Sequence, residues 1–232
     1  MTTVLLLHGI PGCARDWSAV AAELAGDFEV WAPDLVGFGT RANRARDLWA
    51  DAQACALAAE LPAARDLIVV GHDFGGPVAL HLLPLIRARV RGLVLAATNV
   101  FPDTPLPFPL SLVRLPGMPR VLFSAPSLRM MLRGHPDPVS ALGPPQQQAA
   151  IREIFTAGLR ELPQRYEEVE QLLRSADVPK RVIWGDRDPF FPIAQGWRTA
   201  EAAGAPLRVV ERAGHFLPHE APDVFVDAVR NL

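Results

Sequence analysis

The feature that most constrains the fold of this chain is a regular alternation of short apolar runs with longer segments of helical character. The apolar runs are rich in valine, leucine and isoleucine, and they occupy residues 4–7, 28–32, 67–70, 93–95, 181–184 and 207–210. Continuous apolar runs between helices are typical of strands that helices cover on both faces. The alternation therefore predicts an α/β fold in which a mostly parallel sheet is flanked by helices.

Helices are expected between these runs, at residues 16–25, 44–61, 78–86, 193–203 and 223–231. The chain has 232 residues, of which 50% are hydrophobic and 21% are charged. This length suits one sizeable domain, or one domain with an insertion, and the composition excludes general disorder.

Residues 99–178 interrupt the alternation with a different composition. The first part is dense in proline, including Pro102 and Pro105, which excludes central strands and helix interiors there. Helical spacing returns at residues 146–159 and 166–173. We interpret this stretch as an insertion of turns and helices.

The insertion directly follows the predicted strand at residues 93–95. Active sites of open α/β sheets lie at the carboxyl ends of the strands, so the insertion is expected to form a helical lid over such a site. We predict a core of residues 1–98 and 179–232, and a lid of residues 99–178.

The charge balance and the cysteine content exclude several classes of partner and compartment. The chain has 23 basic and 25 acidic residues, so no basic surface is expected for nucleic acid or an anionic membrane. Two cysteines, Cys13 and Cys55, are too few for a disulfide framework and fit a reducing cytosol. The first apolar run, at residues 4–7, is too short for a signal peptide or a membrane span. We therefore expect a soluble cytoplasmic protein.

Neither a metal nor a nucleotide cofactor is expected. No spacing of histidine, cysteine and aspartate resembles a set of metal ligands. The loop at residues 9–12 contains glycines but lacks the lysine of a phosphate-binding loop.

The stretch at residues 69–77, Val-Val-Gly-His-Asp-Phe-Gly-Gly-Pro, is the most informative in the chain. It places Asp73 between small residues where a buried strand runs into a helix, and these allow a sharp, closely packed turn. The turn is expected to push the Asp73 side chain over the edge of the sheet. There, free N–H groups at the start of the helix stabilise an anion. Taken alone, the stretch also fits an aspartate that only caps the helix.

This stretch resembles the nucleophile elbow of the α/β-hydrolase fold, with aspartate in the position where serine hydrolases have serine. Four other motifs resemble those of the same fold and occur in the matching order. They are an oxyanion loop at residues 8–12, a loop at 33–39, an acid turn at 184–189 and a histidine loop at 213–216. The resemblance covers the chain outside the insertion. It implies an α/β-hydrolase fold in which the antiparallel strands that usually precede the oxyanion loop are missing.

An aspartate at the elbow favours displacement at saturated carbon. Aspartate is ionised at neutral pH and needs no base before it attacks. Attack on an ester or amide carbonyl would give an anhydride, which is energetically unfavourable, whereas attack on a saturated carbon gives an ordinary ester. The family members that carry this aspartate are epoxide hydrolases and haloalkane dehalogenases, so the resemblance implies one of these two activities.

The resemblance also implies roles for four other residues. His215 is the candidate base that activates a water to hydrolyse the ester on Asp73, with His219 as a weaker candidate. Asp188 is the candidate acid that orients His215, selected over Asp186 by its spacing from Gly185. The backbone N–H groups of Ile10 and Phe74 are expected to hold the oxyanion formed in that hydrolysis.

The leaving group separates the two activities. Epoxide opening needs an acid, which epoxide hydrolases supply from the lid as two tyrosines or as a tyrosine and a histidine. The insertion contains the single tyrosine of the chain, Tyr166, and one histidine, His135, which are the candidate pair. Halide loss needs N–H donors, but Phe74 stands where dehalogenases have tryptophan, and Ile10 follows Gly9 in the oxyanion loop. We therefore predict an epoxide hydrolase, with a haloalkane dehalogenase as the alternative.

A second alternative is a lidded binding protein with weak catalysis. The missing N-terminal strands and the absence of a second lid tyrosine favour it, and the intact acid and histidine disfavour it. A third alternative is another hydrolase or a lyase in which Asp73 polarises the substrate without forming an ester. The apolar composition of the lid predicts a pocket for a small, hydrophobic, uncharged molecule. Its expected lining residues are Phe101, Phe108, Leu110, Met118, Phe123, Met130 and Met131.

Overall fold

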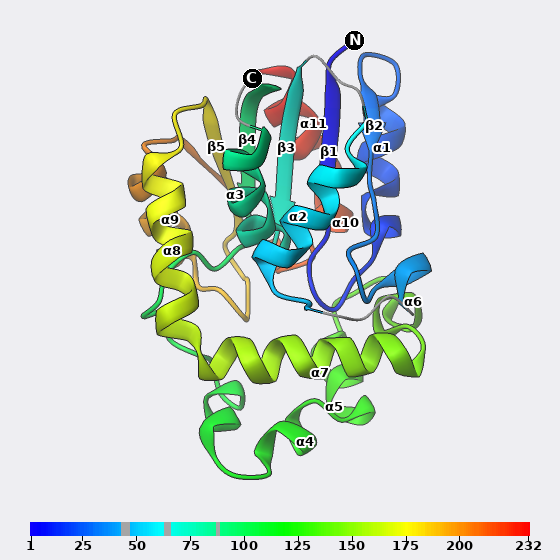
Figure 1. The fold of residues 1–232 in the computed structure, drawn as a ribbon, viewed down its shortest axis with the longest axis vertical. Helices are drawn as coiled ribbons and strands as arrows, with labels where there is room; N and C mark the ends of the chain where they lie inside the picture. The colour runs from blue at the N-terminus through cyan, green and yellow to red at the C-terminus, as the bar shows by residue number, and fades with distance from the viewer. Residues whose placement is uncertain (43–46, 63–65, 87–88) are drawn as a thin grey trace.

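The structure is a computed structural model that describes residues 1–42, 47–62, 66–86 and 89–232. Within these residues, six strands form one sheet in which every neighbouring pair is parallel, in the order β2-β1-β3-β4-β5-β6. The strands are shown in Figure 1 and comprise β1 (Thr3–Leu7), β2 (Glu29–Trp31), β3 (Leu67–His72), β4 (Val90–Ala96), β5 (Lys180–Gly185) and β6 (Leu207–Val210).

The strand order places a topological switch point between β1 and β3. The chain runs from β1 to the edge strand β2 on one side, and then returns to β3 on the other side of β1. Ligands of open α/β sheets bind outside the carboxyl ends of the strands at such a point. The register sets Leu7 of β1 beside Gly71 of β3, so the loops that follow these two strands begin side by side.

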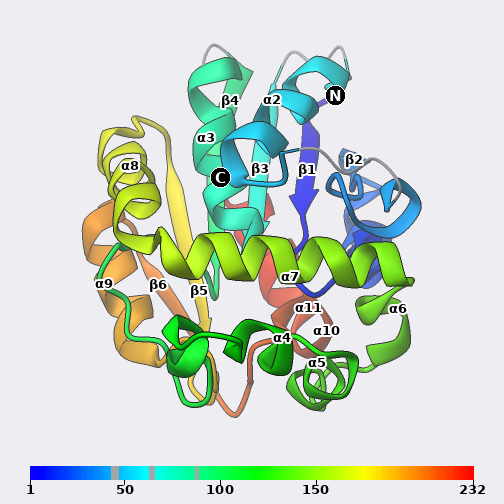
Figure 2. The same cartoon turned by 60° about the horizontal axis from the view of Figure 1, so that its bottom comes forward.

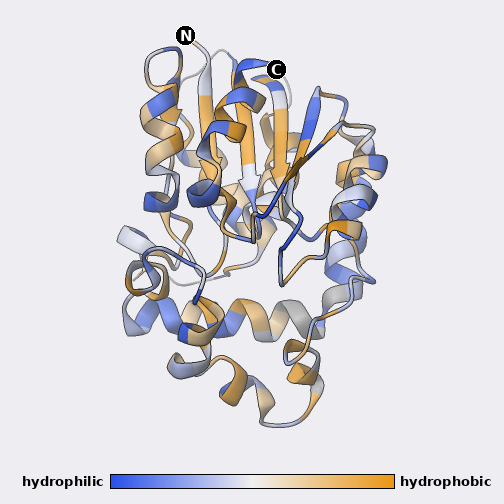
Figure 3. Cartoon of the chain, turned by 180° about the vertical axis from the view of Figure 1, so that it is seen from behind, coloured by the Kyte–Doolittle hydropathy of each residue, from blue (hydrophilic) through white to orange (hydrophobic). Residues whose placement is uncertain are grey.

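Both faces of the sheet are apolar because alternate side chains of a strand point to opposite faces. In β1, Leu5 and Leu7 belong to one buried cluster, whereas Val4 and Leu6 belong to the other. A strand covered on both faces has no exposed position, which explains the continuous apolar runs in the sequence. The central strands are accordingly largely orange in the hydropathy view of Figure 3.

Different helices cover the two faces. On one face, α1 (Ser18–Leu24) packs against α11 (Pro222–Arg230). The other face carries α2 (Ala50–Glu60), α3 (Gly75–Ile86), α8 (Leu162–Ser175) and α9 (Ile193–Ala203). Short helices occur in the connections, namely η1 (Ala14–Trp17), η2 (Gly39–Arg41) and α10 (Leu217–Glu220). Among the helices described, none combines the length and the apolar character that a membrane crossing requires.

Between β4 and β5 the chain leaves the sheet and forms a helical insertion at its carboxyl end. We call the first helices of this insertion the lid helices: η4 (Leu110–Arg114), α4 (Met118–Leu122), α5 (Ala125–Met131), α6 (Pro138–Leu142) and the long α7 (Pro145–Arg160). In Figure 1 α7 lies across the molecule below the carboxyl ends of the strands, with α4 and α5 further down, and in the turned view of Figure 2 it crosses in front of the sheet. The next helix, α8, turns back and lies alongside α3 and α9.

Most of the predicted elements are confirmed, and two coincide fully with α9 and β6. The predicted helix at residues 44–61 is shorter in the described part of the chain, which excludes residues 44–46. There α2 begins only at Ala50 because Trp49 is extended, with φ −73° and ψ 167°. The Asp47 carboxylate accepts the N–H of Trp49 at 3.1 Å and holds the chain in this turn before the helix.

The turn between β3 and α3 leaves no room for additional atoms. A Cβ on Gly71 would lie 2.5 Å from the carbonyl oxygen of Gly75, and a Cβ on Gly75 would collide with the carbonyl oxygen of Leu7. Both obstacles are backbone atoms of packed strands and helices, which cannot swing aside as a side chain does.

We expect Gly75→Ala to destabilise the protein by about 2 kcal/mol or more, because the added methyl group overpacks this backbone crossing. Urea unfolding followed by circular dichroism measures the loss. Gly26→Ala is the matched control, since a Cβ there meets nothing within 4 Å, and its stability should change by at most about 0.5 kcal/mol. Equal stability of the two variants would contradict the packing described for the turn.

Candidate active site

The turn after β3 holds Asp73 in a strained backbone conformation. Its φ of +51° lies in the left-handed region that residues other than glycine rarely adopt. The Asp73 N–H donates to the carbonyl of Ala96 at 3.0 Å. The Asp73 carbonyl accepts from the Thr98 hydroxyl at 2.6 Å and from the Gly76 N–H at 3.0 Å. These bonds fix the strained residue from both β4 and α3, as is common at functional sites.

Backbone N–H groups hold the Asp73 carboxylate. Its Oδ2 accepts the N–H of Ile10 at 2.7 Å, and the N–H of Phe74 also donates to the carboxylate. The approach is close because a Cβ on Gly9 would lie 2.6 Å from the Cβ of Asp73. A simple helix cap needs no bond to a loop 63 residues away in the chain. The contact therefore ties the Asp73 carboxylate to the loop after β1, which capping of α3 alone does not require.

A histidine and a second carboxylate lie beside Asp73. His215, in the loop after β6, places its Nε2 3.7 Å from Asp73 Oδ1 and its Nδ1 2.8 Å from Asp188 Oδ2. Because a carboxylate only accepts, the proton of neutral His215 is assigned to Nδ1, which leaves Nε2 as a base facing Asp73. Asp188 is fixed in turn, since its Oδ1 accepts the N–H groups of Phe190 (2.8 Å) and Phe191 (2.9 Å).

Burial and charge set the pKa values of this cluster. Burial raises the pKa of Asp73. The charge of His215 and the hydrogen bond from the Ile10 N–H would lower this pKa, but the effect of burial is larger. Burial alone would lower the pKa of His215, but the charge and hydrogen bond of Asp188 and the charge of Asp73 raise it above 6.5. Burial would also raise the pKa of Asp188, but His215 and two backbone N–H groups lower it below 3.8. Asp188 is thus ionised at neutral pH and stabilises the protonated form of His215, as a general base requires.

Two other motif histidines are buried and support the loops of the site. Burial and the charge of His215 lower the pKa of His72 to about 3, so its neutral ring donates from Nε2 to the His215 carbonyl at 2.8 Å. His8 accepts the N–H of Leu35 at Nε2 (3.0 Å) and donates from Nδ1 to the Gly9 carbonyl (2.8 Å). Burial lowers the pKa of His8 as well, which keeps this ring neutral.

A cavity of about 110 Å³ opens onto Asp73 and His215. Its wall is mostly apolar, and the lid helices and the preceding loop contribute Leu106, Leu110, Met131, Ile154 and Phe155. An engineered cavity of roughly 150 Å³ in another protein admits benzene, so this volume suits a small molecule.

The structure corrects part of the predicted lining. Leu110 and Met131 line the cavity as predicted. Phe108 and Met130 do not, because their side chains are 82% and 52% exposed on the outer side of the insertion. Phe108 lies in the loop before η4 and Met130 on the short helix α5, and composition alone does not show which side of such segments faces inward.

Three further residues that were predicted to line the cavity pack elsewhere. Phe101 is buried beneath the guanidinium of Arg198, which lies 3.8 Å from the centre of its ring. Phe123 is buried behind Phe155 and stacks on it, with ring centres 4.9 Å apart, so Phe155 presents its ring to the cavity instead. Met118 packs partly buried against the core cluster.

Tyr166 lines the cavity, but it lies on α8 rather than on a lid helix. Its ring contacts the edge of Trp49, with centres 5.7 Å apart, and the Asn99 side chain hydrogen-bonds to its hydroxyl. Burial and the charge of Asp73 raise the pKa of Tyr166, so the hydroxyl keeps its proton over the physiological range.

His135 also lines the cavity, in a cluster with Asp16 and His219. The Nε2 atoms of both histidines lie 3.3 Å from Asp16 Oδ1. In the described residues, these three side chains bring ligand atoms within 4.8 Å of one another, as a metal site would. However, His135 Nδ1 accepts the N–H of Asp137 at 3.0 Å, which leaves the ring proton on Nε2, where a metal ion would have to displace it. His219 Nε2 hydrogen-bonds to Asp16 Oδ1, whereas the buried Nε2 of His135 has no hydrogen-bond partner in the part of the chain that the structure describes. A proton on this Nε2 fits a metal centre poorly.

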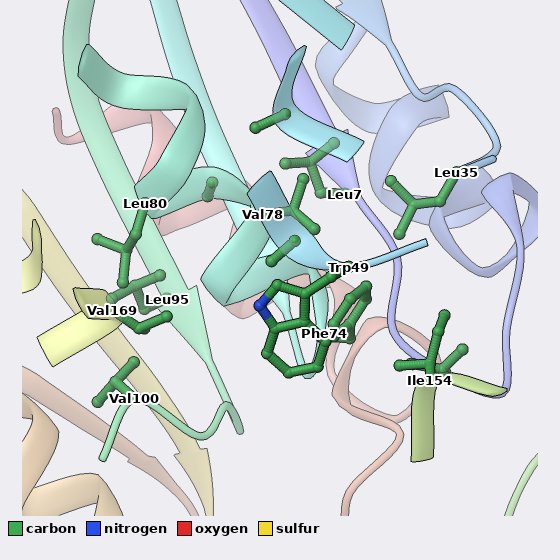
Figure 4. Close-up of a cluster of buried hydrophobic side chains, with 14 of the residues drawn as sticks. Leu7, Leu35, Trp49, Phe74, Val78, Leu80, Leu95, Val100, Ile154 and Val169 are labelled. Atoms are coloured by element: carbon green, nitrogen blue, oxygen red, sulfur yellow. The ribbon is translucent and has the colours of Figure 1, made fainter. Parts of the chain in front are cut away.

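Sequence reasoning missed Trp49, Asn99 and Asp16 as lining residues. Asn99 follows the carboxyl end of β4, a position typical of site residues in such sheets, and this signal could have found it. Trp49 and Asp16 belong to no motif. Figure 4 shows Trp49 packed against Phe74, with ring centres 5.5 Å apart.

Comparison with known proteins agrees with this geometry. Residues 4–228 match the alpha/beta hydrolase family. The chain belongs to this family. An uncharacterized protein of Mycobacterium tuberculosis is 28% identical to this hydrolase over 99% of the chain and 74% of its own length. The 2-hydroxymuconate semialdehyde hydrolase of Pseudomonas sp. strain CF600 is 30% identical over 97% of the chain and 84% of its own length.

Solved structures share the fold of this α/β-hydrolase at lower identity. An ancestral haloalkane dehalogenase superposes with a TM-score of 0.82 and 20% identity, covering 99% of this chain and 90% of that one. The epoxide hydrolase CorEH gives a TM-score of 0.75 and 22% identity, covering 100% and 90%. The predicted fold class, with a helical insertion after β4, is confirmed.

Asp188→Asn tests the charge coupling in this α/β-hydrolase. Asp188→Asn removes the charge that raises the pKa of His215, whereas burial still lowers this pKa. The pKa of His215 should therefore fall. An NMR titration of the imidazole signals measures the change, and His215→Gln identifies the signal. An unchanged titration would show that Asp188 does not act on His215.

The same variant should lose stability in a defined pH range. The raised pKa of His215 contributes stability that is present below pH 6.5 and is lost as the pH rises through the folded-state pKa. The lowered pKa of Asp188 contributes stability that is present above pH 3.8 and is lost as the pH falls through its folded-state pKa. The loss in unfolding free energy should therefore be largest between these two values, and a loss that is independent of pH would contradict the coupling.

Proposed function

We propose that this α/β-hydrolase is an epoxide hydrolase that acts through a covalent ester on Asp73. The observation that carries the proposal is that Asp73 and the buried Tyr166 line one apolar cavity. A carboxylate attacks saturated carbon without a base, and a tyrosine supplies the proton that the opened ring oxygen needs. The two groups together match the requirements of epoxide opening.

In the first step, Asp73 Oδ1 attacks an epoxide carbon while Oδ2 keeps its bond from the Ile10 N–H. The ring C–O bond breaks, its electron pair stays on the oxygen, and this oxygen takes the proton of Tyr166. The products are a hydroxyalkyl ester of Asp73 and a phenolate at Tyr166, so one negative charge moves from the carboxylate to the phenol oxygen.

In the second step, a water gives a proton to His215 Nε2 and attacks Cγ of Asp73. The oxyanion forms at Oδ2, where the N–H groups of Ile10 and Phe74 already donate. Collapse of this intermediate breaks the ester bond, and the departing diol oxygen takes the proton from His215. The regenerated carboxylic acid releases its proton, which restores Tyr166 and closes the cycle.

The two steps are coupled through charge. Burial and the Asp73 charge raise the pKa of Tyr166, which keeps the phenol protonated in the free enzyme. When Asp73 becomes an ester, its charge disappears and no longer opposes ionisation of Tyr166. Loss of the phenolic proton therefore becomes easier in the step that requires it.

The cavity supports a small, hydrophobic and uncharged substrate. Its volume is about 110 Å³, and its walls near the lid are formed by aliphatic and aromatic side chains such as Leu110 and Phe155. Charged arginines are absent from its lining in the described part of the chain. A substrate carboxylate would therefore lose its hydration without gaining a guanidinium partner.

Haloalkane dehalogenation through the same ester is the second candidate, and Trp49 is the observation in its favour. Its ring lines the cavity beside Phe74, and an indole N–H is a donor that a departing halide needs. The side chains of Ile10 and Phe74 offer no such donor. The tyrosine hydroxyl in the same cavity favours the epoxide.

His215→Gln separates the two chemistries. The variant keeps the nucleophile but lacks the base of the second step, so the ester should accumulate. Intact-protein mass spectrometry after incubation with panels of epoxides and haloalkanes measures the adduct. An epoxide adds its full mass, whereas a haloalkane adds its mass less hydrogen halide.

The double variant Asp73→Ala, His215→Gln is the control and should give no adduct. Absence of any adduct with His215→Gln, together with an inactive wild-type protein, would instead support a lidded binding protein.

Tyr166→Phe removes the only tyrosine hydroxyl of the chain. We expect ester formation from an epoxide to slow by about a hundredfold or more, because the ring oxygen loses its proton donor. Hydrolysis of the ester should continue at its former rate. Stopped-flow fluorescence under single-turnover conditions measures both steps, and an unchanged opening rate would remove Tyr166 from the mechanism.

A further inference from the structure

The Asn99 side chain is held in one orientation by donors on its oxygen side. Its Oδ1 accepts the N–H of Phe101 at 3.2 Å and the hydroxyl of Thr104 at 2.5 Å. A backbone N–H only donates, so the atom that faces it must be the amide oxygen. The NH₂ group of Asn99 is therefore on the other side of the carboxamide. Asn99 and Tyr166 line the same cavity, and hydrogen bonding by the Asn99 side chain lowers the pKa of the Tyr166 hydroxyl, against the effect of burial.

This orientation determines the direction of the Tyr166 proton. An amide NH₂ has no accepting lone pair in its normal state, so Asn99 donates and the tyrosine oxygen accepts. The phenolic proton does not take part in this bond and remains available for an acceptor in the cavity. Trp49, which contacts the tyrosine ring edge-on, restricts the remaining freedom of the ring.

We propose that Asn99 is a positioning residue that directs the Tyr166 proton into the cavity and stabilises the phenolate left when this proton moves to the epoxide oxygen. This inference rests on the proposed epoxide hydrolysis and deepens it. It assigns a role to a residue that belongs to none of the motifs.

The role is greatest in the transition state. As the ring C–O bond breaks, the oxygen takes the proton from Tyr166 and negative charge develops on the phenol oxygen. The bond from Asn99 then becomes charge-assisted, and such bonds are roughly twice as strong as neutral ones. An interaction that strengthens as the reaction proceeds accelerates the step rather than only binding the substrate.

One short segment also ties this pair to the nucleophile. Thr98 donates its hydroxyl to the Asp73 carbonyl at 2.6 Å, and the next residue is Asn99. The segment after β4 thus contacts the proposed nucleophile, Asp73, through Thr98 and contains Asn99, the residue proposed to hold the proton donor. A fixed separation between the two suits a reaction in which both act on one epoxide ring.

The test compares Asn99→Asp with Asn99→Leu. Asn99→Asp keeps the shape and the acceptor for Phe101 and Thr104 but replaces the donor by an acceptor, which would capture the phenolic proton. Asn99→Leu removes the donor without adding charge. In single-turnover kinetics we expect ester formation from an epoxide to slow about a hundredfold in Asn99→Asp and about tenfold in Asn99→Leu. Ester hydrolysis should stay within about twofold of the wild-type rate.

Asn231→Asp is the matched control. It makes the same chemical change at an exposed site near the C-terminus, where the Asn231 side chain donates only to the Asp227 carbonyl of its own helix, and both steps should keep their rates. A merely structural role for Asn99 would leave the isosteric Asn99→Asp active or slow both steps alike. Either of these results would overturn the proposal.

A second readout does not depend on any epoxide. The chain has one tyrosine, so 3-fluorotyrosine incorporated in its place gives a single fluorine NMR signal from position 166. We expect this signal to shift in both Asn99 variants and to stay unchanged in Asn231→Asp. If the signal shifts but no epoxide alkylates the protein, the proposed function has failed. If epoxides react and neither the signal nor ester formation responds to Asn99, the positioning role is wrong.

Discussion

The close approach of the loop after β1 to the turn after β3 is the contact on which the rest of the site depends. Parallel pairing sets Leu7 beside Gly71, and the N–H of Ile10 then reaches Asp73 Oδ2 at 2.7 Å. This approach is possible only where the backbone carries no side chains, which is why glycines surround the aspartate. The strained φ of Asp73 persists because hydrogen bonds from three directions, including the hydroxyl of Thr98, hold its backbone.

A buried carboxylate needs hydrogen-bond donors. The site supplies such donors to Asp73 and, in the proposed reaction, to the oxygen of Tyr166. Burial raises the pKa of Asp73, and the backbone N–H of Ile10 and the charge of His215 oppose this rise. In the proposed reaction the charge moves to the oxygen of Tyr166, where the Asn99 amide is already in place. Because these donors are fixed before the reaction, little reorganisation is needed as the charge moves.

The sequence predicted those parts of the structure that local rules determine. The strands and most helices follow from apolar runs and spacing, and Asp73, Asp188 and His215 come together because each lies in the connection that follows the carboxyl end of a strand. The lining of the cavity could not be predicted equally well. Phe108 and Phe123 are as hydrophobic as Phe155, but only the packing of the loops and helices of the insertion against one another decides which ring faces the cavity.

The insertion has two parts: the lid helices, and helix α8, which carries Tyr166. Tyr166 lies on α8, which packs beside α3, and α3 begins at the turn that carries Asp73. The proposed nucleophile therefore lies in the turn before α3 and the proposed proton donor on the adjacent helix α8, so their separation does not depend on the lid helices. The lid helices instead supply apolar side chains such as Ile154 to the wall of the cavity. Substitutions in these helices can therefore alter the shape of the cavity while Asp73 and Tyr166 keep their positions.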